Sequence, residues 1–449
     1  MNQPTHQLSL WLHKRHVADI GYEPLNEAWS LRYTDEWSQD RQAFALSPAL
    51  PLDAECSSAS IRRFIENLLP EGRALDIVAS AQGVAKSNVY GLIRALGAET
   101  TGAFRFLPHG EDGGKEPSRV RPREISLAEL DERIGERESR PLMEWDGKVR
   151  MSVAGYQDKL LVYANGEPGE VPMFLPDFPL ASTHILKPEP ADARLPHMVA
   201  NEHFCMKLAK RLGLPAASVS ILRTPRPVLA IARFDRAAHN DTSGSWVERK
   251  HIIDACQASD LPATYKYERN IGSVGEAALY RDGVSFPKLF DLLEHATRKA
   301  ADRLTMLRWA LFQLVIGNSD AHGKNFSFFV HRSGLQAAPW YDLVSVVQYP
   351  QFSHDLAMAF GDEFDLDQIK AFSLADFAQR CGIDRQLLVR ECRRMRDGVR
   401  QHAVEVANSQ PYLAAERELV SKIVEFAQAQ SERLEAASRE ARGISPNML

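Results

Sequence analysis

The sequence predicts an α+β fold, with a small N-terminal α+β unit, a strand-rich middle part and a mostly helical C-terminal part. The first hundred residues mix strand-like runs with amphipathic helical stretches. Residues 109–124 are rich in Gly, Pro and charged residues and almost free of apolar ones, which is typical of a linker or a long surface loop. After Asp235 the pattern becomes mostly helical. We therefore expect domains over residues 1–120, 121–235 and 236–449.

The composition is that of an ordinary globular protein. The chain has 449 residues, of which 44% are hydrophobic and 25% charged, and its net charge of -5 gives no global reason to expect nucleic-acid or membrane binding. The five cysteines are scattered and form no C-x-x-C pair, which favours a reducing compartment. The most apolar stretch, Leu304 to Ile316, is too short to span a bilayer and contains Arg308. With no secretory signal at the N-terminus, a cytoplasmic protein is expected.

The N-terminal unit combines strands and short helices. Strand-like runs are LSLWLHKRHVADIG and GAFRFLP, and SIRRFIENLL reads as a helix that follows the capping residues Ser57 and Ser58 and ends before Pro70. After the linker, LAELDERI is typical of a short amphipathic helix.

In the middle part, one helix interrupts a series of strand-like segments. These segments are VRMSVAG, KLLVYANG, STHILKP and RPVLAIARFDR. The helix is expected from about Pro196 to Leu212, closed by Gly213 with Pro215 just beyond. At the other end of the chain, the last forty residues have the pattern of an amphipathic helix with a frayed tail.

The most informative stretch follows the apolar helix Leu304 to Ile316 and the break at Gly317. Asp320 and Asn325 are separated by four residues in a polar segment, the D-x-x-x-x-N spacing of kinase catalytic loops. Phosphoryl transfer needs a carboxylate that accepts the proton of the attacking hydroxyl and an amide oxygen that holds Mg²⁺ on the phosphates. The pair by itself is equally compatible with two residues that merely cap a turn.

A hairpin pattern after this loop strengthens the interpretation. Apolar runs FSFFVH and QAAPWYDLV flank a turn at Arg332 to Gly334, and Asp342 lies at the far end. A hairpin would bring Asp342 back beside the loop, where its carboxylate could share a metal with Asn325.

Two charged residues upstream fit the same chemistry. Lys187 ends the strand-like run STHILKP, where a lysine can neutralise the α and β phosphates of ATP, although such lysines are often simply solvated. Glu202 interrupts an otherwise apolar helical stripe, and a buried carboxylate needs a partner such as Lys187. The alternative is that Glu202 lies at the edge of the stripe and reaches water. The segment Ser152 to Lys159 could wrap phosphates, but its single glycine makes it a poor glycine loop.

Taken together, these residues resemble the HipA toxins, the serine/threonine kinases of bacterial HipBA toxin-antitoxin modules. The matching segments cover nearly the whole chain in the order ENLLPEGRALD, SVAGYQDK, THILK, ANEHFCMKLAKRLGL, LAIARFDR, GNSDAHGKNFS and YDLVS. The resemblance implies a kinase-like two-lobed core after the N-terminal unit, and an enzyme that uses ATP and Mg²⁺.

The resemblance also implies roles for individual positions. Asp320 looks like the catalytic base, Asn325 and Asp342 like the magnesium ligands, and Lys187 like the ATP-phosphate lysine, with Glu202 as its ion-pair partner. Ser152 falls on the serine that family members autophosphorylate, which silences the kinase. The remaining ATP-binding positions form a phosphate loop, a hinge that reads adenine and the rest of the nucleotide pocket: Ala154, Gly155, Tyr156, Gln157, Asp158, Lys159; Ala232, Arg233, Phe234; His322, Gly323, Lys324, Asn325, Tyr341 and Asp342.

The chain departs from the family pattern at a few places. Tyr156 replaces the small residue expected inside the phosphate loop, and Ala232 stands where an acidic residue can occur at the hinge. The second change matters little if backbone atoms read adenine. Residues 239–283 match poorly, so no role is carried over to them.

Family members phosphorylate an aminoacyl-tRNA synthetase, which halts translation and arrests growth, and they join a HipB-like helix-turn-helix antitoxin dimer in a repressor complex on operator DNA. The resemblance implies these partners here, with the DNA contacted through the antitoxin. The basic run RECRRMRDGVR could approach DNA phosphates, but such a run is more often a solvated helix face. Two other functions stay open: a kinase-fold phosphotransferase acting on a small molecule, and a catalytically silent co-repressor.

Overall fold

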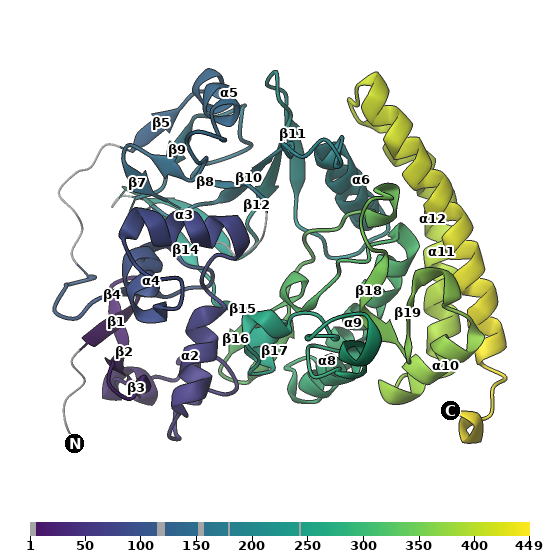
Figure 1. Ribbon diagram of the computed structural model, residues 1–449, viewed down its shortest axis with the longest axis horizontal. Coiled ribbons are helices and arrows are strands. Elements are labelled where there is room, and N and C mark those ends of the chain that lie inside the picture. Colours follow the sequence, from purple (N-terminus) through teal and green to yellow (C-terminus); the bar gives the residue numbers. More distant parts are fainter. Residues whose placement is uncertain (1–5, 115–121, 151–156, 178–179, 242–243) are drawn as a thin grey trace. The chain divides into compact units, whose positions relative to one another are not determined.

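The computed structural model describes residues 6–114, 122–150, 157–177, 180–241 and 244–449, and it confirms the α+β class (Figure 1). The chain divides into two compact units that each collect several stretches of sequence. Unit 1 comprises Met1–Pro188, Ser220–Ile253 and Phe329–Arg332, and unit 2 comprises Glu189–Val219, Asp254–Phe328 and Ser333–Leu449. The three sequence ranges expected as domains stay a prediction.

The first sheet of unit 1 has the strand order β3-β2-β1-β4. The run LSLWLHKRHVADIG is not one strand but the hairpin of β1 and β2, which pairs Leu8 with Ile20 and Leu10 with Ala18. These four side chains are all buried, so one face of the hairpin builds core. The elements of this part are β1 His6–Leu12, β2 Arg15–Glu23, β3 Ala28–Tyr33, α1 Asp35–Gln39, α2 Ser58–Glu66, α3 Gly72–Gln82, α4 Val89–Leu96 and β4 Arg105–Pro108. Helix α2 is capped by the Ser57 side chain, as the sequence predicts.

The second sheet of unit 1 has the strand order β11-β12-β10-β8. Strand β10 is antiparallel to both of its neighbours, and Lys187 lies opposite Leu229 of β12. Its strands are β8 Leu160–Val162, β10 His184–Pro188, β11 Val219–Leu222 and β12 Val228–Ala232. The expected helix LAELDERI is α5 Leu127–Gly135, and its buried face packs in one hydrophobic cluster with Trp145, Leu160 and Leu186.

Three short ladders complete the strands of unit 1, in the pairs β5-β9, β6-β7 and β13-β14. Their bounds are β5 Arg123–Ile125, β6 Glu144–Trp145, β7 Lys148–Val149, β9 Met173–Leu175, β13 Arg236–Asp241 and β14 Gly244–Arg249. The chain after Asp235 thus begins with a hairpin and not with a helix. Its alternating residues, such as Ala237 to Asn240, carried no strong strand signal, because β-propensity depends on what the strand packs against.

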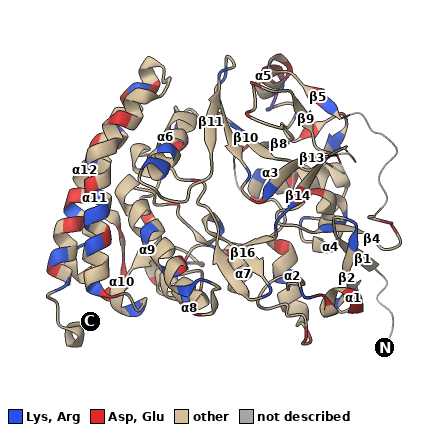
Figure 2. Cartoon of the chain, turned by 180° about the vertical axis from the view of Figure 1, so that it is seen from behind, with Lys and Arg blue, Asp and Glu red and all other residues tan. Residues whose placement is uncertain are grey.

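Unit 2 is mostly helical. Its helices are α6 Met198–Arg211, α7 Ala255–Ala258, α8 Phe286–Leu292, α9 Lys299–Ile316, α10 Ala371–Arg380, α11 Arg385–Ser409 and α12 Ala414–Ala441, and its two-stranded ladder joins β18 Asp355–Phe360 to β19 Glu363–Asp365. Figures 1 and 2 show the two longest helices, α11 and α12, packed side by side along their length. Arg308, which interrupts the apolar stretch of α9, forms an ion pair with Glu391 of α11 at 2.8 Å.

A three-stranded sheet contains the predicted hairpin. Strand β16 Ser327–His331 lies between β15 Ile252–Asp254 and β17 Gly334–Ala337. The turn falls at Arg332 and Ser333, as expected from the sequence. Asp342 lies five residues beyond the end of β17, in irregular structure.

Within the described residues, every helix is too short or too polar to cross a bilayer.

Candidate functional site

The predicted catalytic loop begins where α9 ends. Gly317 closes the helix in the left-handed conformation, at φ 67°, and its N–H donates to the carbonyls of Gln313 and Leu314. A Cβ atom at this position would lie 2.5 Å from Val347 Cγ2 and 2.8 Å from Phe426 Cε1. Only glycine meets both demands, so the end of α9 and the start of the loop are fixed.

Residues 318–325 hold one another in place by hydrogen bonds. The side chain of Asn318 donates to Gln313 Oε1 at 2.8 Å and accepts from the N–H of Asp320 at 3.2 Å. Asn325 donates through Nδ2 to the carbonyl of Asp320 at 3.0 Å. His322 accepts from the N–H of Lys324 at 3.2 Å. These bonds arrange the loop around Asp320, and the one from Asn325 uses its amide nitrogen.

Asp320 is the exposed residue of a loop whose other side chains are buried. Residues 321–325 are all buried, whereas Asp320 is exposed. Its Oδ1 accepts a hydrogen bond of 2.6 Å from the hydroxyl of Tyr267. Because this carboxylate is exposed, an acceptor hydroxyl can come within hydrogen-bond reach of it, which a general base requires.

Tyr341 ties the segment that carries Asp342 to the same loop. Its hydroxyl hydrogen-bonds to Ser327 Oγ and to the carbonyl of Lys324, both at 2.7 Å. The ring is only partly buried, but its hydroxyl is enclosed, and this burial raises the pKa of Tyr341. Asp342 has a positive φ of 59°, uncommon for a residue other than glycine and a conformation in which aspartate is enriched. The structure thus brings Asp320, Asn325 and the Tyr341-Asp342 segment together.

Lys324 forms an ion pair within the site. Its Nζ lies 2.6 Å from Oδ2 of Asp254, and both side chains are largely buried. Asp254 also caps helix α7 through its other carboxylate oxygen, which accepts from the N–H of Gln257 at 2.9 Å. The charge of Lys324 is therefore already engaged by a carboxylate.

The other predicted ATP-binding residues that the structure describes belong to unit 1. Lys187 at the end of β10 and Lys159 just before β8 are both buried, with exposed fractions of 9% and 6%. Gln157 and Asp158 are partly buried. Lysines at such positions can contribute positive charge toward the phosphates of a nucleotide, a role that stays a prediction for both residues.

The predicted hinge follows β12. Ala232 is the last residue of β12. The ring of Phe234 packs edge-on against that of Phe329, with ring centroids 5.9 Å apart. The N–H of Arg233 donates to the carbonyl of Thr183 at 2.8 Å. The N–H of Arg233 could therefore bind adenine only if this hydrogen bond were broken, whereas its carbonyl is not involved in the bond.

The side chain of Arg233 belongs to a buried charge network. Its guanidinium donates to both carboxylate oxygens of Asp235, at 3.0 and 2.8 Å, and to Ser182 Oγ at 2.9 Å. Burial alone would raise the pKa of Asp235, but Arg233 and Arg236 outweigh it and lower the pKa to about 2. Burial, assisted by Arg233, lowers the pKa of Arg236 to about 9. We infer that this network holds the segment after β12 rigid.

Glu202 lies inside helix α6 with an exposed fraction of 1%, so its carboxylate does not reach water. The same helix is fastened to the YDLVS segment by Asn201, which donates to the carbonyl of Ser345 at 3.1 Å and accepts from its N–H at 2.8 Å. The ion pair of Glu202 with Lys187 stays a prediction.

The basic run of α11 is balanced by carboxylates. Figure 2 shows Lys and Arg side chains interleaved with Asp and Glu along α11 and α12. Arg396 lies 3.0 Å from Glu435 and 2.7 Å from Asp397, and Arg400 lies 3.4 Å from Asp397. These ion pairs support the interpretation as a solvated helix face over direct contact with DNA.

Several predicted positions lie outside the described residues, namely Ser152, Ala154, Gly155 and Tyr156. Their roles stay predictions.

Sequence reasoning missed Tyr267, Asp254 and Glu268. All three lie in the region 239–283, from which no role was carried over. Glu268 is buried and accepts from the N–H of Ala359 at 2.8 Å and from Arg281. A buried carboxylate in a polar segment leaves no periodic pattern, so the sequence held no signal for it.

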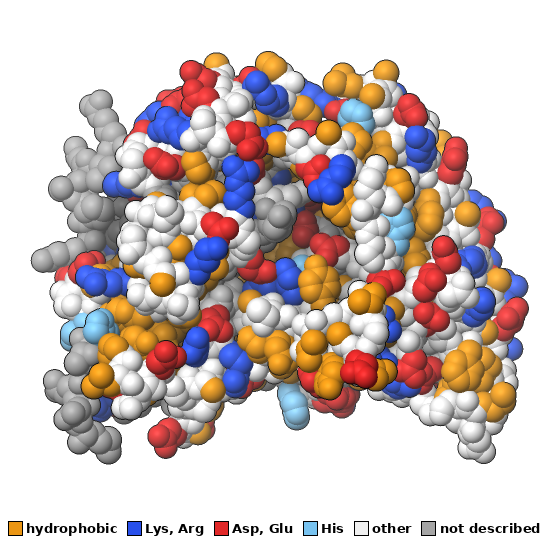
Figure 3. All heavy atoms as spheres, in the orientation of Figure 1, with side chains coloured by type: hydrophobic (Ala, Val, Ile, Leu, Met, Phe, Trp, Pro, Cys, Tyr) orange, Lys and Arg blue, Asp and Glu red, His pale blue; other side chains and the backbone are white. Residues whose placement is uncertain are grey.

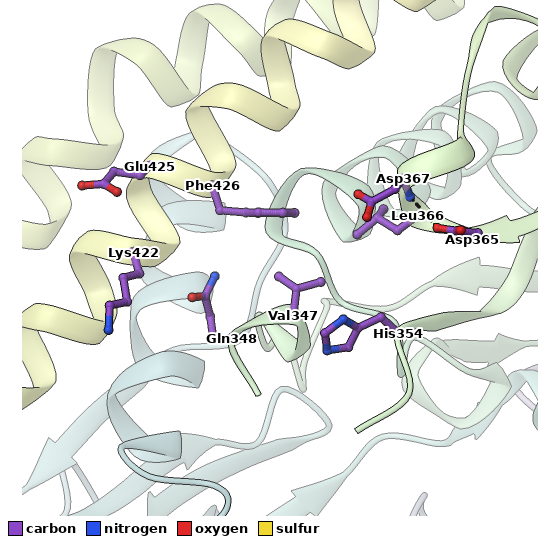
Figure 4. Close-up of a pocket in the computed structure, with 9 residues that line it drawn as sticks. All are labelled: Val347, Gln348, His354, Asp365, Leu366, Asp367, Lys422, Glu425 and Phe426. Atoms are coloured by element: carbon purple, nitrogen blue, oxygen red, sulfur yellow. Dashed lines mark hydrogen bonds between the residues drawn. The ribbon is translucent and has the colours of Figure 1, made fainter. Parts of the chain in front are cut away.

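Unit 2 also contains a pocket of about 440 Å³ that is separate from the predicted site residues (Figure 4). Its lining is mixed in character and comprises Val347, Gln348, His354, Asp365, Leu366, Asp367, Lys422, Glu425 and Phe426. Two of the lining residues lie against the start of the catalytic loop: the N–H of Val347 donates to the carbonyl of Gly317 at 3.1 Å, and Phe426 packs close to Gly317.

Comparisons with known proteins agree over nearly the whole chain. The family model described as the HipA N-terminal domain matches residues 8–107, and the one described as the HipA-like C-terminal domain matches residues 151–405. A serine/threonine-protein kinase toxin HipA from Shewanella oneidensis is 40% identical over 87% of each chain. A kinase-type relative from Sinorhizobium fredii, Y4mE, is 35% identical over 83% of this chain and 86% of its own.

A solved structure extends the match to the fold. The HipA chain in a complex of Shewanella oneidensis HipA, HipB and operator DNA superposes with a TM-score of 0.86 at 38% identity, covering 98% of this chain and 100% of that one. With both domain models matched in order, the chain belongs to the HipA family of serine/threonine-protein kinase toxins.

Proposed function

We propose that this protein is an ATP- and Mg²⁺-dependent serine/threonine kinase that uses Asp320 as its catalytic base. The observation that carries the proposal is the loop itself: an exposed carboxylate stands on a buried, hydrogen-bonded loop that also holds Asn325 and is fastened to Asp342 through Tyr341. When bound, Mg²⁺-ATP supplies the transferable phosphoryl group and the charge neutralisation that the transfer needs.

The residues fit these ligands by their chemistry. Asn325 Nδ2 donates to the carbonyl of Asp320, so its Oδ1 would be the atom that binds a cation. The carboxylate of Asp342 would supply a second oxygen ligand of the kind that Mg²⁺ prefers. Lys187 and Lys159 supply positive charge for the phosphates. Asp320 orients the acceptor hydroxyl and takes its proton as the oxygen attacks phosphorus and the bond to ADP breaks.

We further propose that the acceptors are proteins, with Ser152 of the chain itself and a component of translation, an aminoacyl-tRNA synthetase, as targets in the cytoplasm. Phosphorylation of such a target would arrest growth. The related HipA was solved with HipB and operator DNA, which supports a HipB-like antitoxin dimer as partner and co-repression of the operon through it.

The proposal is tested with purified protein, labelled ATP and a cell extract, followed by identification of the labelled protein and residue. We expect label on one serine or threonine of an extract protein and on Ser152 for the wild type, and none for Asp320→Asn. Label that ends on a small molecule would favour a small-molecule phosphotransferase. Antitoxin binding without any transfer would favour a silent co-repressor.

Ser152 provides a second test. A phosphate there would place a dianion beside the phosphate loop, so we expect the phosphorylated protein to bind ATP much more weakly. Calorimetry with the phosphorylated and unphosphorylated protein measures this, and equal affinities would contradict it.

A further inference from the structure

The catalytic base has a partner that no family motif supplies. The hydroxyl of Tyr267 donates to Asp320 Oδ1 at 2.6 Å, and its ring stands perpendicular to that of His322, with centroids 5.1 Å apart. A carboxylate has two oxygens, and a hydrogen bond to one of them fixes the plane of the group and leaves the other for an acceptor hydroxyl.

The backbone around Tyr267 is held on both sides. The carbonyl of Lys266 accepts from the N–H of Gly323 at 2.8 Å, and the N–H of Glu268 donates to the carbonyl of Ala357 at 2.9 Å. A Cβ on Gly283 would come within 1.8 Å of the carbonyl oxygen of Tyr267, so the two chain segments touch directly. The backbone of Tyr267 is therefore held in place by neighbouring segments on both sides.

The segment after Tyr267 forms a loop whose two ends contact each other and the rest of unit 2. We call residues 269–282 the acceptor loop. The N–H of Asp282 donates to Asn270 Oδ1 at 3.1 Å. The guanidinium groups of Arg269 and Arg281 lie 3.7 and 5.1 Å from the ring centroid of Phe364. The ends of the loop are thus clamped to the body of unit 2.

The outer part of the acceptor loop exposes hydrophobic side chains. Ile271, Val274, Leu279 and Tyr280 have exposed fractions of 60%, 79%, 79% and 53%. In the part of the chain that the structure describes, eleven large hydrophobic side chains are exposed, and five of them lie between Tyr267 and Tyr280. Figure 3 shows hydrophobic, charged and other side chains on one face of the molecule. A concentration of this kind marks an interaction surface.

We propose that the acceptor loop binds the polypeptide that carries the hydroxyl to be phosphorylated, and that Tyr267 is a positioning residue for Asp320. This inference rests on the proposed kinase function. An acceptor hydroxyl on Asp320 lies within a few ångströms of Tyr267, and an extended chain advances about 3.4 Å per residue, so the residues flanking the acceptor fall across the loop. A small polar acceptor would have no use for four exposed hydrophobic side chains, whereas a protein surface does.

The surface is tested by the double substitution Val274→Ser with Leu279→Ser. Both side chains are exposed, so the fold should be unaffected. If the melting temperature of this first double variant falls, a second one, Ile271→Ser with Tyr280→Ser, is measured as well. The matched control is Leu25→Ser with Val404→Ser, which removes two exposed hydrophobic side chains far from the loop in sequence. The readout is the rate at which labelled phosphate from ATP enters the proteins of a cell extract.

We expect the loop variants to transfer label at least about tenfold more slowly than the wild type and the control to stay within about twofold. Transfer at the wild-type rate by both loop pairs would overturn the proposal. So would an unchanged rate combined with loss of antitoxin binding or of self-association, since the surface would then serve an antitoxin or a second copy. In the same assay, transfer by Asp320→Asn at the wild-type rate would refute the proposed kinase function itself. If Asp320→Asn is inactive while the loop variants are fully active, only the proposed role of the acceptor loop is refuted.

Tyr267→Phe tests the positioning role. Removal of the hydroxyl keeps the ring on His322, and we expect kcat to fall about tenfold while KM for ATP is unchanged, because the nucleotide residues are untouched. The control Tyr22→Phe removes a hydroxyl from the N-terminal sheet and should keep the wild-type kcat. A kcat equal to the wild type would refute positioning, and a higher kcat would show that Tyr267 blocks the base.

Discussion

Single buried groups decide how this chain responds to pH, and His251 is the clearest case. It lies between β14 and β15 and is 5% exposed, with Nε2 2.8 Å from the carbonyl of Leu46 and its ring centroid 4.6 Å from that of Phe104. Nδ1 is buried, and the structure shows no hydrogen-bond partner for it. Burial lowers the pKa of His251 to about 4, so the neutral ring is the folded form.

We predict that unit 1 loses stability as pH falls from about 6.5 to about 4. Because the pKa of His251 is lower in the folded than in the unfolded state, its contribution is fully present above pH ~6.5 and is lost on acidification, by up to about 3 kcal/mol. Thermal midpoints measured across this range should fall for the wild type. The thermal midpoint of His251→Phe should be lower than that of the wild type at pH 7 but should change less with pH. The thermal midpoint of His331→Phe, at an exposed position, should change with pH as that of the wild type does. Equal pH slopes for all three proteins would contradict the assignment of the pH dependence to His251.

A separate prediction concerns the role of Asp342 in binding the metal. Asparagine tolerates the positive φ of 59° as well as aspartate does, so Asp342→Asn should keep the melting temperature within about 2 °C. If Asp342 is a magnesium ligand as proposed, the substitution removes a charged oxygen ligand, so the Mg²⁺ concentration for half-maximal transfer should rise at least about tenfold. Asp355→Asn, at an exposed position, serves as control. An unchanged Mg²⁺ requirement would remove Asp342 from the metal site.

At the scale of elements, the catalytic loop depends on close contacts that glycine permits. A Cβ on Gly323 would lie 2.6 Å from Val284 Cγ2, and Val284 is fully buried. Gly323→Ala must therefore displace the loop that carries Asp320 and Asn325.

We expect Gly323→Ala to lose about 1–3 kcal/mol of stability and to slow phosphoryl transfer by about 10- to 100-fold. Adding Val284→Ala makes room for the new methyl group, so the double variant should recover part of the transfer rate even though Val284→Ala alone loses core packing. Transfer by Gly323→Ala at the wild-type rate would show that the loop position is not critical.

The elements also show what the sequence could predict. Helices α2, α5, α6 and α9 and the hairpin β16-β17 follow from capping residues, apolar periodicity and turn residues. The hairpin β13-β14 and the region around Tyr267 do not, because their structure is set by contacts distant in sequence, such as that between Gly283 and Tyr267.

At the scale of the whole molecule, the motif residues are divided between the two units. Lys187 and Arg233 belong to unit 1, whereas Asp320, Asn325 and Asp342 belong to unit 2. Spacing along the chain predicted the chemistry of the unit 2 loop, since Asp320 and Asn325 lie in one short segment. It could not predict that Tyr267 donates to Asp320 or that Lys324 is paired with Asp254, because those partners lie 53 and 70 residues away.

The measurement that tests the central claim most directly is single-turnover phosphoryl transfer by wild type and Asp320→Asn, with ATP affinity determined on the same samples. Asparagine keeps the size of the side chain and an oxygen for Tyr267, but it cannot accept the proton of the acceptor hydroxyl. We predict that transfer slows at least about 100-fold while ATP affinity changes less than about threefold. Transfer within about twofold of the wild-type rate, at equal ATP affinity, would contradict Asp320 as the base.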